Sequence, residues 1–198
     1  MLIKRDALNK GMMKSDIDAF LKDKGDYVKM DHLSRFMKES LPVDIRRYVA
    51  TLLAEIYEKK GMVSDSAKMY EVAAMCSVTF QDKIKYFTKE AIVYIKTGMF
   101  ERVDDSIMKA ASECNSKEKA ILQSEIVLAY KKAAQEYETK MQRSHAVKIY
   151  EKMLTMTTVS DAEKIQVRDK LIDLYEKLGK VDRYMTLKRI KEGKNPYS

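Results

Sequence analysis

The stretch Leu53-Ala54-Glu55-Ile56-Tyr57-Glu58-Lys59-Lys60-Gly61 decides how the rest of this chain is interpreted. It consists of residues compatible with a helix and ends at a glycine, the residue that most often terminates a helix in a left-handed conformation. Small and aromatic residues lie at defined distances before and after Gly61: Ala54, Tyr57, Ser66, Tyr70 and Ala73. The stretch therefore predicts a helix that ends at Gly61 and a second helix that follows this turn.

The same spacing recurs along the chain. Gly25, Gly61, Gly98 and Gly179 are four of only six glycines, and Met141 stands where a further turn is due. Four residues before these turns lie, in chain order, Leu21, Tyr57, Tyr94, Tyr137 and Tyr175. Seven before lie Asp18, Ala54, Ala91, Ala134 and Ile172, and twelve after lie Met37, Ala73, Ala110, Met153 and Lys191. Tyrosine and alanine at constant distances from the turns indicate an internal helical repeat.

The fourth turn is unusual because it has no glycine. Met141 must either accept a left-handed conformation, which penalises residues with a side chain, or lie in a turn of a different shape. We expect the second arrangement. At other helix ends the sequence supplies ordinary caps, Thr79 with Asp82 and Ser160 with Glu163. Residues 1–13 show no clean periodicity, so we expect a frayed lead-in.

This spacing resembles the tetratricopeptide repeat, although the units here run 36 to 43 residues against a characteristic 34 in that family. The resemblance implies an all-α, right-handed α-α superhelix, a solenoid formed by one domain over residues 1–198. Its antiparallel helical hairpins, about five in number, would span residues 14–41, 44–77, 80–114, 117–157 and 161–192, followed by a short basic C-terminal tail. The final helix should turn Val181, Tyr184, Leu187 and Ile190 to one side. The core should include Leu53, Tyr57, Tyr70, Ala73, Ala91, Tyr94, Ala110, Tyr137, Ala146, Tyr150, Leu171 and Tyr175.

The composition argues against an enzyme. His32 and His145 lie in different units without metal-ligand spacing, Cys76 and Cys114 form no metal motif, and every interior glycine is solitary. We therefore expect no catalytic residue, no cofactor and no metal. No apolar run approaches the length of a membrane span. With two cysteines and no signal-like start, we expect a cytoplasmic protein.

Members of the tetratricopeptide family usually bind peptide segments of other proteins on a concave face formed by the first helix of each repeat. The resemblance therefore implies a scaffold or adaptor whose partner is another protein. Its candidate contacts are the residues two, five and nine places into each first helix. These are Tyr48, Thr51, Glu55, Lys85, Thr88, Ile92, Leu128, Lys131, Gln135, Gln166, Asp169 and Asp173.

Two alternatives remain open from the sequence. Half of the formal net charge of +8 lies between Lys180 and Ser198, which permits a nucleic-acid-associated adaptor that uses the basic C-terminal end. This alternative is less favoured, because basic and acidic residues are interleaved through the repeats and form no one-signed stripe. Self-association through an exposed end of the array is the second alternative.

Overall fold

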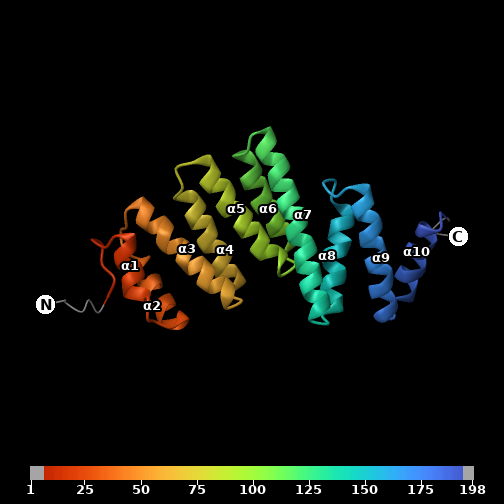
Figure 1. Cartoon of the computed structure of the whole chain (residues 1–198), viewed down its shortest axis with the longest axis horizontal. Coiled ribbons are helices and arrows are strands. Elements are labelled where there is room, and N and C mark those ends of the chain that lie inside the picture. The colour runs from red at the N-terminus through yellow and green to blue at the C-terminus, as the bar shows by residue number, and fades with distance from the viewer. Residues whose placement is uncertain (1–6, 194–198) are drawn as a thin grey trace. The chain divides into compact units, whose positions relative to one another are not determined.

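The computed structural model describes residues 7–193, and these residues form ten α-helices with no β-strand among them (Figure 1). In chain order they are α1 (Lys14–Leu21), α2 (Asp26–Phe36), α3 (Val43–Lys59), α4 (Val63–Met75), α5 (Phe80–Ile95), α6 (Phe100–Ser112), α7 (Ser116–Thr139), α8 (Arg143–Thr155), α9 (Asp161–Lys177) and α10 (Val181–Lys191). The all-α class predicted from the sequence is confirmed, with helix boundaries close to the expected ones.

The helices are distributed over two compact units. Unit 1 comprises Met1–Tyr94 with Val103–Asn115, and unit 2 comprises Ile95–Arg102 with Ser116–Ser198. Within unit 1, α3 packs on α4 and on α2; within unit 2, α8 packs on α7 and α9, and α9 on α10. The predicted single domain and right-handed superhelix depend on how the units are arranged, and they stay predictions.

Four helix-ending turns share one backbone geometry. Gly61, Gly98, Met141 and Gly179 all have positive φ angles, of 72°, 71°, 58° and 65°. At three of them the next residue donates its N–H to the carbonyl of the tyrosine five positions earlier, at 2.9 Å: Met62 to Tyr57, Gln142 to Tyr137 and Lys180 to Tyr175. This 6→1 bond is the Schellman motif. The expectation of a differently shaped turn at Met141 is wrong, because Met141 accepts the left-handed conformation.

The N-terminal region departs from the expected pattern in two ways. Gly25 has a φ of −69° and precedes α2 as its N-cap, so it does not end α1 in a left-handed turn. Leu8 and Met12 are buried and join a core cluster that includes Ile17 and Phe36. The expected frayed lead-in is therefore wrong for residues 7–13, because these two apolar side chains cover the first hairpin. Residues 1–6 of that lead-in lie outside the described part of the chain.

The predicted core is largely buried. Nine of the twelve predicted residues are buried: Leu53, Tyr70, Ala73, Ala91, Ala110, Ala146, Tyr150, Leu171 and Tyr175. Tyr57, Tyr94 and Tyr137 are only partly buried. The Tyr57 hydroxyl lies 3.1 Å from Ser34 Oγ, and the Tyr137 hydroxyl donates to the Lys96 carbonyl. At these positions the aromatic ring is partly buried, and the hydroxyl group at its end makes a polar contact.

The two expected helix caps are present, and the expected apolar face of the last helix is only partly formed. The Asp82 N–H donates to Thr79 Oγ1 at 3.1 Å, and Ser160 forms a capping box with Glu163. In α10, Tyr184 and Leu187 are partly buried. Val181 and Ile190 are 65% and 39% exposed, so these two residues of the expected apolar side are not buried.

Candidate partner-binding site

A groove of about 310 Å³ lies between α1, α2 and α3, entirely within unit 1. Its apolar lining comes from all three helices: Leu21, Leu33, Leu52 and Ile56. Its charged lining consists of Asp18, Lys22, Asp26, Lys29, Glu55 and Lys59. Volumes of this order fall at the lower end of the range for ligand pockets, which combine an apolar surface with a few polar groups.

Local sequence explains how these side chains meet. On α3, residues 52, 55, 56 and 59 share one helix face because they are spaced three and four apart. The short α1 ends at Leu21, and α2 begins at Asp26 after a brief connection, so both helices present their adjoining ends to this face. Leu21 and Leu33 are buried in the core, which fixes the apolar part of the groove.

The carboxylates of the groove are already engaged within the chain. Asp26 forms ion pairs of 2.9 and 3.1 Å with Lys59 and Lys60, and these bonds lower the pKa of its carboxyl group. Glu55 pairs with Lys89 on α5 at 3.1 Å. The Tyr48 hydroxyl donates to Asp18. Burial, and then this bond, raise the pKa of Tyr48 to about 12, so the hydroxyl keeps its proton at neutral pH.

Two lysines of the groove differ from these groups. Within the described residues, Lys22 and Lys29 make no ion pair and no side-chain hydrogen bond with another part of the chain. Lys22 is exposed and Lys29 is half-buried. They are the two lysines of the groove lining without a carboxylate partner among the described residues.

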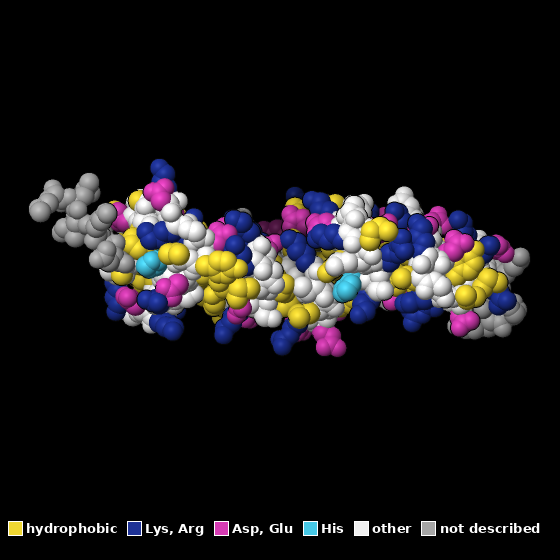
Figure 2. Space-filling model, turned by 90° about the horizontal axis from the view of Figure 1, so that it is seen from below, with side chains coloured by type: hydrophobic (Ala, Val, Ile, Leu, Met, Phe, Trp, Pro, Cys, Tyr) yellow, Lys and Arg dark blue, Asp and Glu magenta, His cyan; other side chains and the backbone are white. Residues whose placement is uncertain are grey.

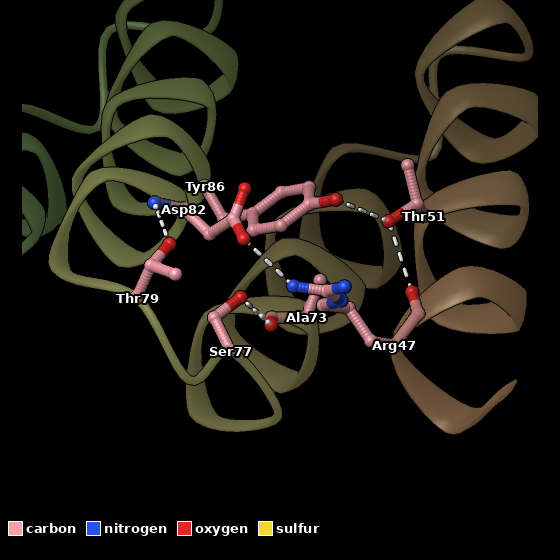
Figure 3. Close-up of polar contacts among 7 residues, drawn as sticks. All are labelled: Arg47, Thr51, Ala73, Ser77, Thr79, Asp82 and Tyr86. Carbon is pink, nitrogen blue, oxygen red and sulfur yellow. Dashed lines mark hydrogen bonds and ion pairs between the residues drawn. The ribbon is translucent and has the colours of Figure 1, made fainter. Parts of the chain in front are cut away.

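Contacts between α3 and α5 hold the neighbouring surface in place (Figure 3). Arg47 reaches Asp82 at 2.8 Å, and the hydroxyls of Thr51 and Tyr86 lie 3.2 Å apart. The Thr51 hydroxyl donates to the Arg47 carbonyl at 2.9 Å. The Ser77 hydroxyl donates to the Ala73 carbonyl at 2.8 Å and closes the end of α4. The Arg47–Asp82 and Thr51–Tyr86 contacts link α3 to α5.

Of the twelve predicted contact residues, only Glu55 lines the groove. Tyr48 and Thr51 lie elsewhere on α3, half-buried and hydrogen-bonded as described above. On α5, Lys85 is exposed and Ile92 is half-buried. Thr88 is buried, and its hydroxyl donates to the Ile84 carbonyl at 2.7 Å. In this conformation Thr88 therefore serves helix packing.

The predicted residues of unit 2 lie on α7 and α9, and none of them lines that groove. Leu128, Gln135, Gln166 and Asp169 are exposed, whereas Lys131 and Asp173 are half-buried. Three of these residues form ion pairs: Lys131 with Glu163 at 2.6 Å, Asp169 with Lys191 at 2.8 Å, and Asp173 with Lys177 at 2.7 Å. As partner contacts, all twelve residues remain predictions.

Sequence reasoning missed the α1 and α2 sides of the groove. The family resemblance assigned contacts only to the hairpins from residue 44 onward, because the repeat pattern is weakest in the first hairpin. Residue spacing gave no signal for this side, because Lys22 and Asp26 are separated by the turn between α1 and α2 and spacing aligns side chains only within one helix.

The basic C-terminal end is partly neutralised. Arg183 pairs with Glu151, Lys191 with Asp169, and the Lys188 ammonium donates to the Tyr184 hydroxyl. In Figure 2, Lys and Arg side chains lie among Asp and Glu side chains on the face that is drawn. Lys194 lies outside the described residues. The nucleic-acid alternative stays a prediction without added support.

Residues 7–193 contain no cluster of three or more His, Cys, Asp or Glu side chains arranged to hold a metal ion. None of the helices in this part of the chain combines the length and apolar character that crossing a membrane requires. The expectations of no catalysis, no cofactor and a cytoplasmic location remain predictions.

No protein-family model matches the chain, and no curated protein matches it in sequence. Among solved structures, the chain is similar to BtubC (BKLC) from P. vanneervenii, with 16% sequence identity and a TM-score of 0.39. The match covers 90% of this chain and 80% of BtubC. A TM-score at this level establishes neither a shared family nor a shared function.

Proposed function

We propose that this chain is a protein-interaction module that binds a peptide or a helix of another protein in the groove between α1, α2 and α3. It performs no chemistry of its own. One observation carries the proposal: an apolar depression on a helical scaffold, rimmed by charged side chains, that no part of the described chain fills. Peptide segments are commonly recognised by apolar grooves between helices, where side chains of the ligand supply the anchors.

The groove is suited to this role because its walls are fixed before a ligand arrives. Leu33 is fully buried, Leu21 nearly so, and the α3 wall is tied to α5 through Arg47 and Glu55. A preformed site lowers the entropy lost on binding, so a short segment can bind with useful affinity.

The test is a selection of random twelve-residue peptides displayed on phage against the full chain. Affinities of the selected peptides are then measured by fluorescence anisotropy. Leu52→Trp fills the groove and should weaken binding at least about tenfold, because it displaces the ligand anchor. Ile121→Trp adds the same ring at an exposed position of α7 in unit 2, and this control should bind normally.

Two results would overturn the proposal. A selection that yields no binding peptide argues against an interaction module for peptides. Selected peptides whose affinity is the same for Leu52→Trp and the unaltered chain place the binding surface elsewhere. Circular dichroism of both variants shows whether the helices are retained.

A further inference from the structure

We infer that the groove between α1, α2 and α3 selects an acidic peptide segment, one that places an apolar side chain in the groove and carboxylates against Lys22 and Lys29. This inference rests on the proposed function and adds the chemical class of the partner. It comes from a difference among the charged groups of the groove: Asp26 and Glu55 form ion pairs within the chain, whereas Lys22 and Lys29 form none among the described residues.

The first step concerns the charge balance. Three carboxylates line the groove, those of Asp18, Asp26 and Glu55. Asp26 is shared by two lysines, and Glu55 is bound by Lys89 on α5. Three lysines, Lys22, Lys29 and Lys59, also line the groove, and two of them, Lys22 and Lys29, have no carboxylate partner among the described residues. These two unpaired ammonium groups favour a negatively charged ligand.

The second step concerns which groups a ligand can reach. A basic ligand would have to compete with lysines already placed 2.9 to 3.1 Å from Asp26 and Glu55. Asp18 already accepts the Tyr48 hydroxyl, although it bears no ionic partner among the described residues. An acidic ligand meets no such competition at Lys22 and Lys29. Electrostatic complementarity of this kind contributes more to selectivity than to total affinity.

The third step concerns the anchor. Leu21 and Leu33 of the lining are buried, whereas Leu52 and Ile56 are only partly buried and so keep apolar surface open to the groove. A volume of about 310 Å³ leaves room for an apolar side chain of a ligand. The expected ligand therefore combines a leucine-like or aromatic anchor with acidic neighbours.

The experiment uses the peptides obtained by phage selection and two double variants of the full chain. Lys22→Gln/Lys29→Gln removes both charges, and Lys22→Arg/Lys29→Arg keeps them. We expect the selected sequences to be enriched in Asp and Glu beside apolar residues. The glutamine variant should bind them about fivefold to tenfold more weakly, and the arginine variant within about twofold of the unaltered chain. Affinity should also fall as salt is raised.

A matched control uses Lys68, an exposed lysine of α4 that does not line the groove. Lys68→Gln should leave affinity unchanged. Selected peptides that are lost on Leu52→Trp but are neutral or basic, or that bind the glutamine variant normally, overturn this inference and leave the proposed function standing. Peptides insensitive to Leu52→Trp overturn both.

Discussion

The hydroxyl of Tyr70 on α4 donates a 3.0 Å hydrogen bond to Glu58 Oε2 on α3. The same bond recurs in unit 2, where the Tyr150 hydroxyl on α8 donates to Glu138 on α7 at 2.5 Å. In both hairpins the glutamate lies three residues before the turn and the tyrosine nine after it. Burial raises the pKa of both phenols, with the neighbouring carboxylates adding to the shift, so both stay protonated donors. The repeat therefore reproduces a polar contact as well as a fold.

Removing that contact should weaken unit 1. Tyr70→Phe deletes the hydroxyl from a side chain that is 1% exposed and leaves Glu58 without this bond. We expect a loss of about 1–2 kcal/mol in the free energy of unfolding, measured by urea titration. Tyr27→Phe is the control, since Tyr27 is 71% exposed, and it should change stability little. Equal effects of the two substitutions would show that the Tyr70–Glu58 bond adds nothing.

Met141 should be replaceable by glycine with a gain in stability. Its φ of 58° is costly for a residue with a Cβ, and Gly61 and Gly179 adopt the same conformation freely. Met141→Gly should therefore raise stability by about 1 kcal/mol, less the entropy that glycine adds to the unfolded chain. Met141→Ala keeps the backbone penalty and should give no such gain. If the melting temperature rises equally for both variants, the destabilisation comes from the methionine side chain and not from the left-handed backbone conformation.

Ala91 should tolerate no long charged side chain. It is fully buried at the position seven residues before Gly98, where the repeat requires a small residue. Ala91→Arg places an unpaired guanidinium in that space, and we expect loss of the cooperative thermal transition in circular dichroism. Lys85→Arg, on an exposed position of the same helix, should melt like the unaltered chain. Retention of the original melting temperature by Ala91→Arg would contradict the helix packing.

Stability in acid should depend on Glu163. Hydrogen bonds from Lys131, and then from Ser160, lower the pKa of its carboxyl group to about 2. A depressed pKa contributes stability above the unfolded value of about 4.3, and that stability is lost as the pH falls toward 2. Glu163→Gln should therefore flatten the decline of melting temperature between about pH 4 and 2. Glu101→Gln, at an exposed position of α6, serves as the comparison and should leave the slope intact.

The carboxyl group of Glu90 should make stability depend on pH in the opposite sense to that of Glu163. Its side chain is nearly fully buried on α5, Oε2 has no hydrogen-bond partner in the described structure, and Lys109 lies 3.5 Å from Oε1. Burial raises the pKa of this carboxyl group despite the lysine. The stability that protonation contributes is present below about pH 4.3 and is lost as the pH rises through the raised pKa. Keeping this buried carboxyl group ionised is therefore a cost to stability.

Glu90→Gln should relieve that cost. A gain of about 1 kcal/mol would raise the melting temperature by about 2–4 °C at neutral pH. Glu71→Gln is the matched change on the other partner of Lys109, at 2.6 Å, and it should give no gain because that ion pair is more exposed. A melting temperature that falls for Glu90→Gln would mean that its pairing with Lys109 outweighs burial.

The sequence predicted most of the fold because the repeat is marked by residues with a local physical role. Gly61, Gly98 and Gly179 end helices, Ser160 with Glu163 starts one, and Ala91 marks a close crossing. Met141 was misjudged because the same local turn, closed by the Gln142 N–H bond to the Tyr137 carbonyl, forms there without a glycine, against the usual preference at this position.

The candidate site was much harder to predict. Of the residues that line the groove, only Glu55 was predicted. The prediction placed contacts two, five and nine residues into the first helix of each repeat, and this placement assumes repeats of regular geometry. The first hairpin is irregular, with a helix of eight residues and a Gly25 that precedes α2 instead of ending α1. Which lysines stay unpaired also depends on contacts across helices. Lys59 reaches Asp26 on α2, whereas Lys22 has no such partner in the described chain.

The most direct test of the account is to titrate the ¹⁵N-labelled full chain with an acidic peptide obtained from the phage selection and to follow amide chemical shifts by NMR. We predict that the largest shifts fall on α1, α2 and α3, at Lys22, Lys29, Leu33 and Leu52. We also predict that these shifts are lost in the Lys22→Gln/Lys29→Gln variant. Shifts concentrated on α7 and α9, around Leu128 and Gln166, would contradict the account and place the binding surface on unit 2.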